Sequence, residues 1–180
     1  MSKIYLFLII IFFIVSCATI KTERDDLKGI TSYYTSDVKT EGAFLYAFVY
    51  DEYPNSYYFN LNVKTDELSS PIDMQEVYFF DNNTRENISF KLEKIGHYTT
   101  YTSGYISSSG YYYQPQKLYI GYGLKSLNKN ELDTLYNFMI KSTSTKIRFY
   151  GNFTVDYYLS IGQKKNIIEI IKRYKNNSLK

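Results

Sequence analysis

The sequence predicts an α+β domain: a mostly antiparallel sheet or sandwich with two helices in its C-terminal half, at about residues 127–141 and 161–175. Between residues 29 and 123, short runs rich in Tyr, Phe, Val, Ile and Thr are bounded by Asn, Pro, Gly and Ser, which is typical of antiparallel strands. Further along, apolar residues recur at helical spacing. The chain has 180 residues, 44% of them hydrophobic, which suffices for one core.

Two hairpins are predicted from the alternation of apolar and polar residues. The first pairs residues 43–51 with 57–66 across a turn at 53–56, because Phe59, Leu61 and Val63 alternate with polar positions. The second pairs 75–81 with 88–95 across 82–87, and Lys94 is expected to mark the edge of its second strand.

The C-terminal third is expected to run helix, strand, helix. Asn128 and Glu131 form a capping pair for the first helix, whose apolar positions recur every three to four residues. Residues 146–153 return to a period of two, which favours a strand. Ser160 and Gln163 then open the second helix. The apolar stripes of both helices favour packing on the sheet over a partner-binding groove.

The N-terminus has the layout of a secretion signal. A positive start at residues 1–3 is followed by an unbroken apolar run at 4–15 and the small Ser16. The residues Ile14-Val15-Ser16-Cys17 resemble the lipobox of bacterial lipoproteins. The resemblance implies cleavage before Cys17 and acylation of its thiol with diacylglycerol and a chain such as palmitate. The expected organisation is a signal peptide at 1–16, a lipidated tether at 17–28 and a single globular domain at 29–180.

Two other interpretations of the N-terminus remain open. An uncleaved membrane helix at residues 4–20 is short against the roughly 20 residues needed to span a bilayer. An ordinary cleaved signal would leave Cys17 as an unpaired thiol in an oxidising compartment. Under the lipoprotein interpretation the protein belongs to the cell envelope. Ala18 rather than Asp after the cysteine implies the outer membrane if the host is Gram-negative.

Composition excludes several function classes. With one cysteine and one histidine, His97, the mature fold has no internal disulfide, no Cys-rich zinc site and no Cys–His pair. No nucleophile-elbow pattern accompanies His97, and no spacing of the 18 acidic residues forces a catalytic pair. The net charge of +3 is interspersed, which argues against nucleic acid as a partner. We expect no catalytic residue, no metal and no cofactor.

One stretch is typical of a recognition surface. Residues 98–116 combine tyrosines with Ser, Thr and Gly, which together give rigid contact area and an adaptable backbone. The candidate binding residues are Tyr101, Tyr105, Tyr111, Tyr112 and Tyr113. The alternative is an ordinary long hairpin in a chain with 22 tyrosines, since tyrosine also populates strands.

The expected function is therefore a membrane-anchored lipoprotein that acts as a non-catalytic binding or adhesion module of the cell envelope. Its partners would be membrane lipid, through acylated Cys17, and an envelope protein or glycan. The alternatives are a structural or assembly lipoprotein of the envelope and, with less support, a hydrolase.

Overall fold

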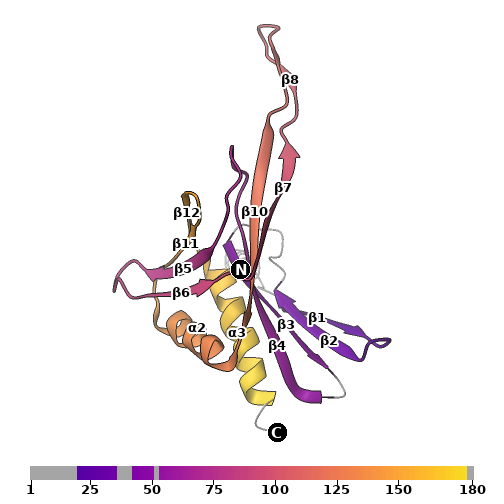
Figure 1. The fold of residues 1–180 in the computed structure, drawn as a ribbon, viewed down its shortest axis with the longest axis vertical. Helices are drawn as coiled ribbons and strands as arrows, with labels where there is room; N and C mark the ends of the chain where they lie inside the picture. Colours follow the sequence, from indigo (N-terminus) through magenta and orange to yellow (C-terminus); the bar gives the residue numbers. More distant parts are fainter. Residues whose placement is uncertain (1–19, 36–41, 51–52, 178–180) are drawn as a thin grey trace, which may run out of the picture.

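The fold is α+β, as the sequence predicts: the described residues form a six-stranded sheet, a four-stranded sheet, a two-stranded ladder and two helices (Figure 1). It comes from a computed structural model that describes residues 20–35, 42–50 and 53–177. The signal sequence and Cys17 lie outside the described residues, so the lipobox prediction stays a prediction.

The larger sheet has six strands in the order β1-β2-β3-β4-β10-β7, all antiparallel to their neighbours. Its strands are β1 (Ile20–Asp25), β2 (Ile30–Thr35), β3 (Gly42–Tyr50), β4 (Tyr53–Lys64), β7 (Lys94–Tyr101) and β10 (Lys117–Leu127). Because side chains alternate between the two faces of a strand, Ala43, Leu45, Leu61 and Val63 share one buried face.

The smaller sheet has four strands in the order β12-β11-β5-β6, again antiparallel. These are β5 (Glu76–Asp81), β6 (Asn87–Lys91), β11 (Thr145–Tyr150) and β12 (Thr154–Tyr158). Its inner face is apolar, with Val77, Phe79, Ile147 and Phe149 fully buried, and its outer face alternates to partly exposed residues.

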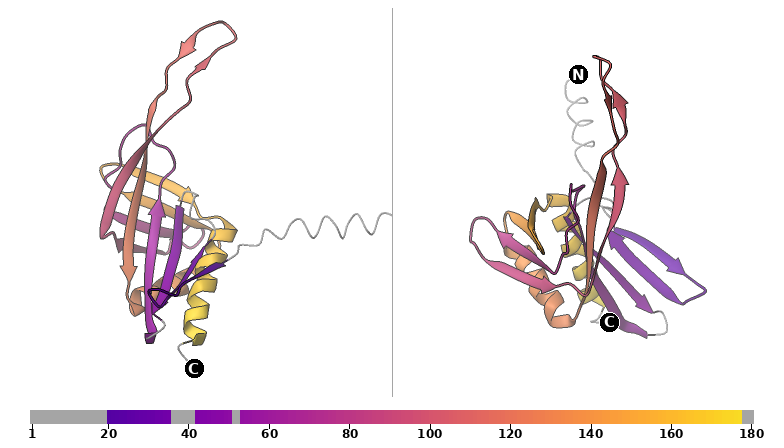
Figure 2. Two further views of the ribbon diagram at one scale, coloured as in Figure 1. Left: turned by 90° about the vertical axis from the view of Figure 1, so that its right-hand side faces the viewer. Right: turned by 45° about the horizontal axis from the view of Figure 1, so that its top comes forward.

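The helices join the two sheets into one core (Figure 2). α2 (Lys129–Lys141) buries Leu132, Leu135, Phe138 and Met139, and the Phe138 ring lies 6.5 Å from that of Phe79 in the smaller sheet. α3 (Ile161–Asn177) contacts α2 and strands β2 and β3 of the larger sheet. The apolar stripes of both helices therefore pack on the sheets.

Both predicted helix starts are confirmed. The Glu131 backbone NH donates to the Asn128 side chain, and the Glu131 carboxylate accepts from the Asn128 backbone NH. The Gln163 NH donates to Ser160 Oγ, and the Gln163 side chain accepts from the Ser160 NH. Each box satisfies backbone NH groups that the first helical turn leaves without a carbonyl partner.

The predicted tether at 17–28 is wrong from Ile20 onward, because residues Ile20–Asp25 form β1 and pair with β2. The side chains at 21–24 are exposed, which is why the segment has the composition of a linker. What holds it is the backbone ladder with β2 and the partial burial of Ile20 against the core.

The two predicted hairpins are confirmed, but their strands begin and end at other residues than predicted. The 53–56 turn is wrong: those residues begin β4, and Tyr50 pairs with Tyr53 beside an irregular register. The predicted second strand of the other hairpin is split at Leu92 and Glu93. The Leu92 NH bonds to Gln75 and the Glu93 NH to Leu124, so the chain leaves the smaller sheet for the larger one there.

The predicted order helix, strand, helix misses β12. Residues 151–153 form a turn in which the Gly151 NH donates to the Phe153 carbonyl, and β12 returns alongside β11. Only Val155 and Tyr157 of β12 turn toward the core, and each is partly buried. At the edge of the sheet, a strand with so few inward residues carries a weak alternation signal.

Candidate functional site

The tyrosine-rich segment forms the far end of a long hairpin that projects beyond the rest of the molecule (Figures 1 and 2). We call residues 98–116 the tyrosine arm. It continues from β7 and β10 into a short ladder of β8 (Tyr105–Ile106) with β9 (Tyr112–Tyr113). The long hairpin is therefore confirmed, and its role in recognition stays a prediction.

Polar contacts within the arm fix its shape. At its neck, the Thr102 NH donates to the Gln116 carbonyl at 3.0 Å, and the Gln116 NH donates to Thr102 Oγ1 at 2.8 Å. At its tip, the Ser107 NH donates to the Tyr111 carbonyl and the Tyr111 NH to Ser107 Oγ. Gly110 closes this turn with a φ of 82°, a conformation that glycine adopts without steric cost.

The five predicted tyrosines are all exposed on the arm. Their exposed fractions run from 51 to 72%, and Ile106 among them is 71% exposed. Tyr105 and Tyr113 face each other across the β8–β9 pair with ring centroids 4.7 Å apart and planes within 10°. Ile106 and Tyr112 form the next cross-strand pair and therefore point to the opposite face. The arm thus presents apolar surface on both faces.

The arm carries no charged residue between positions 98 and 116. Its contact chemistry is that of aromatic rings, phenol hydroxyls and serine and threonine hydroxyls. Tyrosine loses little rotamer freedom on binding, and the stacking of Tyr105 on Tyr113 lowers that loss further. The surface suits a neutral partner, such as an uncharged glycan or the uncharged face of a protein.

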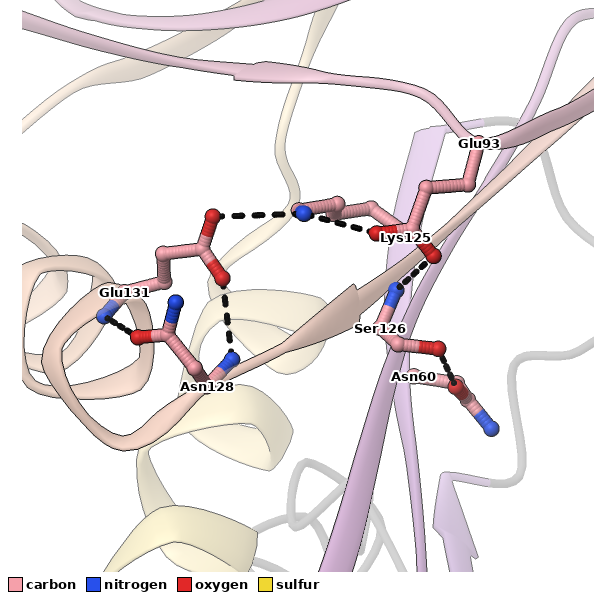
Figure 3. Close-up of polar contacts among 6 residues, drawn as sticks. All are labelled: Asn60, Glu93, Lys125, Ser126, Asn128 and Glu131. Atoms are coloured by element: carbon pink, nitrogen blue, oxygen red, sulfur yellow. Dashed lines mark hydrogen bonds and ion pairs between the residues drawn. The ribbon is translucent and has the colours of Figure 1, made fainter.

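A polar network joins β7 and β10 to the body at the end of this strand pair opposite to the tyrosine arm (Figure 3). Lys125 of β10 lies 2.7 Å from the Glu93 carboxylate and 3.3 Å from that of Glu131 in α2. Glu93 also accepts the Ser126 NH, and Ser126 Oγ donates to Asn60 of β4 at 2.9 Å. The junction before β7, the end of β10, strand β4 and the start of α2 are therefore tied together.

The charges of Glu93 and Lys125 in this network stabilise each other. The hydrogen bond from Lys125, followed by that from the Ser126 NH, lowers the pKa of Glu93, and the hydrogen bond to Glu93 raises the pKa of Lys125. Both groups stay ionised over the neutral range, so this network persists there.

A second surface, not singled out from the sequence, covers the outer face of the smaller sheet. We call its central residues, Tyr78 and Phe80 of β5 and Lys146, Arg148 and Tyr150 of β11, the aromatic platform. The register places Lys146 opposite Phe80 and Arg148 opposite Tyr78. The Tyr78 and Phe80 rings stack at 5.8 Å, and the Arg148 guanidinium lies 5.6 Å from the Phe80 ring centre.

Asp156 of β12 completes the charge pattern of the platform. Arg148 donates to both Asp156 oxygens, at 2.7 and 2.8 Å, and Lys146 lies 2.8 Å from one of them. The hydrogen bond from Arg148 is the main cause that lowers the pKa of Asp156 to about 2, despite partial burial. The sequence signal was the alternation at 146–150, which sets Arg148 and Tyr150 on one face. The register with β5 and β12 is a tertiary property.

The single histidine and the acidic residues beside the first hairpin form no site among the described residues. His97 of β7 is exposed and makes an edge contact with the Tyr119 ring. Asp66 and Glu67 are exposed, whereas Asp51 and Glu52 lie outside the described residues. Within the described part of the chain, no group of three His, Cys, Asp or Glu side chains could hold a metal ion.

Comparisons with known proteins return no relative for this chain. No protein-family model, no curated protein and no solved structure matches it. No helix in the described part of the chain is long and apolar enough to cross a membrane.

Proposed function

We propose that this protein is a lipid-anchored, non-catalytic binding or adhesion module of the bacterial cell envelope, and that it captures its partner with the tyrosine arm. The single observation that supports this role is the exposure of Tyr101, Tyr105, Tyr111, Tyr112 and Tyr113 on one projecting hairpin. Exposed aromatic side chains of this density cost solubility, and they contribute binding energy when a partner covers them.

The lipid anchor is the second part of the proposal and comes from the lipobox at residues 14–17. Acyl chains on Cys17 would hold the domain at a membrane, because each buried methylene contributes about 0.8 kcal/mol. The arm projects from the domain that this anchor would hold, so its contact surface is open to a partner on another envelope component or outside the cell.

Site-specific photo-crosslinking in cells that express the full chain tests the arm. With the photoreactive amino acid p-benzoylphenylalanine in place of Tyr111, we expect covalent adducts of one or a few discrete masses. The matched control places the same amino acid at Tyr58, which is 52% exposed on the body. Tyr112→Ser with Tyr113→Ser in the crosslinking chain should abolish the adduct, because the contact surface is lost. Equal adducts at both positions, or adducts that survive both serines, would contradict the proposal.

The same cells separate failure of the anchor from failure of the arm. Labelled palmitate should be incorporated by the wild-type chain and not by Cys17→Ala. Protease shaving of intact and permeabilised cells then reports which side of the envelope the domain faces. Cleavage on intact cells favours a partner outside the cell, and cleavage only after permeabilisation favours the envelope-assembly role.

A further inference from the structure

A shallow pocket of about 290 Å³ lies where the aromatic platform meets the turn between β5 and β6. This volume is at the small end of ligand pockets, which span roughly 300–1,000 Å³. The pocket therefore suits a ligand of the size of one sugar ring. Its lining combines charged, amide and aromatic groups: Phe80, Asp81, Asn82, Arg85, Lys146 and Arg148.

The electrostatic balance of the pocket favours an anion. Of the two carboxylates at hand, Asp81 is turned into its own loop, where it accepts the NH groups of Asn83 and Thr143 at 2.8 Å. Asp156 is shared between Lys146 and Arg148, so one negative charge serves two cations. The lining holds three cations, Arg85, Lys146 and Arg148, so against these two carboxylates one positive charge is in excess.

Arg85 supplies the cation without a partner. No carboxylate of the described residues pairs with its guanidinium, in contrast to Lys146 and Arg148. Its backbone has a φ of 63°, a conformation that costs any residue with a Cβ and that glycine would adopt freely. Arginine occupies this position despite that cost. The hydrogen bond that the Arg85 NH donates to the Asp81 carbonyl holds the turn.

The uncharged lining narrows the ligand class. Phe80 gives an aromatic ring against which the C–H groups of a sugar can pack. The Asn82 side chain donates from Nδ2 to Ser144, so its Oδ1 can accept a hydrogen bond from a ligand hydroxyl. A bare inorganic anion would use neither group, whereas a sugar that carries a carboxylate uses both.

We propose that this pocket binds a single acidic sugar residue, of the uronic acid type, within a glycan. The sugar carboxylate pairs with Arg85 and Lys146, its ring packs on Phe80, and a hydroxyl donates to Asn82. The pocket is distinct from the tyrosine arm, which projects from the other sheet, so the two surfaces can engage different ligands (Figure 1).

Saturation-transfer difference NMR on the full chain in detergent micelles tests the site, with methyl glucuronide as the probe. We expect transfer to the sugar ring protons, and little transfer to neutral methyl glucoside at the same concentration. Inorganic phosphate in equal amount should leave most of the methyl glucuronide signal. Equal transfer to the neutral sugar, or complete displacement by phosphate, would overturn the proposal.

Substitution of Arg85 assigns the binding to this pocket. Arg85→Gln should weaken methyl glucuronide binding by about tenfold or more, because a charge-assisted hydrogen bond is lost. Arg85→Gly, which suits the backbone conformation at this position, should fold and show the same loss. Arg173→Gln on α3 is the matched control and should bind like the wild type, as should Tyr111→Ser in the arm. Binding that Arg85→Gln leaves unchanged would also overturn the proposal.

Discussion

Phe79→Ala is expected to lower the free energy of unfolding by about 3–5 kcal/mol, the usual cost of removing a buried phenylalanine ring. Phe79 is fully buried and contacts the rings of Phe90 in β6 and Phe138 in α2. Its removal leaves a cavity between the smaller sheet and the first helix. Thermal unfolding followed by circular dichroism, at one protein and detergent concentration, measures the change.

The neighbouring residue provides the control. Phe80 belongs to the outer face of the same strand and is partly exposed, so Phe80→Ala should cost less than about 1 kcal/mol. The pair differs by one position and has the same chemistry, so the difference isolates burial. Similar losses for both variants would contradict the two-faced packing of the smaller sheet.

Gly151→Ala is expected to cost about 1–3 kcal/mol, because an added methyl group has no space there. A Cβ at this position would lie 2.2 Å from the backbone carbonyl oxygen of Asp73. That segment is held in place: the Asp73 NH donates to the Asn152 side chain, and the Gln75 NH donates to the Tyr150 carbonyl. Since backbone rather than a flexible side chain is in the way, the loop must shift.

Gly162→Ala is the matched control and should change stability in the opposite direction. A Cβ there meets only Ser160 Oγ at 3.9 Å, an ordinary contact, and alanine favours the helical conformation over glycine. We expect a gain of about 0.5 kcal/mol in the unfolding free energy, measured in the same thermal scans. No effect at Gly151 would show that the turn after β11 is packed differently, and a loss at Gly162 would show that the first turn of α3 is.

Local signals in the sequence predicted the elements whose cause is local. The capping pairs Asn128–Glu131 and Ser160–Gln163 start both helices as expected, because each contact spans only three residues. The alternation at Phe59, Leu61 and Val63 predicted one buried face, because a strand turns successive side chains to opposite sides. The tyrosine segment was predicted from composition, since residues 98–116 combine tyrosines with Ser, Thr and Gly, and all five candidate tyrosines are exposed.

Elements that are held mainly by backbone hydrogen bonds, rather than by buried side chains, were not predictable. β1 has the composition of a tether and becomes a strand because β2 offers a backbone ladder. β12 depends in the same way on β11, and the sheet change at Leu92 depends on Gln75 and Leu124. These contacts have little side-chain signature, because hydrogen bonds between backbone groups are available to almost any residue.

The sequence by itself determined the α+β class, the helix starts and the tyrosine segment, and the lipobox and its anchor stay predictions from it. Only the tertiary structure decided that the tyrosines share one projecting arm, and that Lys125 joins Glu93 to Glu131 at the opposite end of β7 and β10. It also brought Arg85 of the β5–β6 turn beside Lys146, 61 positions away, at the rim of one pocket. The physical reason is strand register: cross-strand neighbours are set by how hydrogen-bonded ladders align over the common core, which no local pattern specifies.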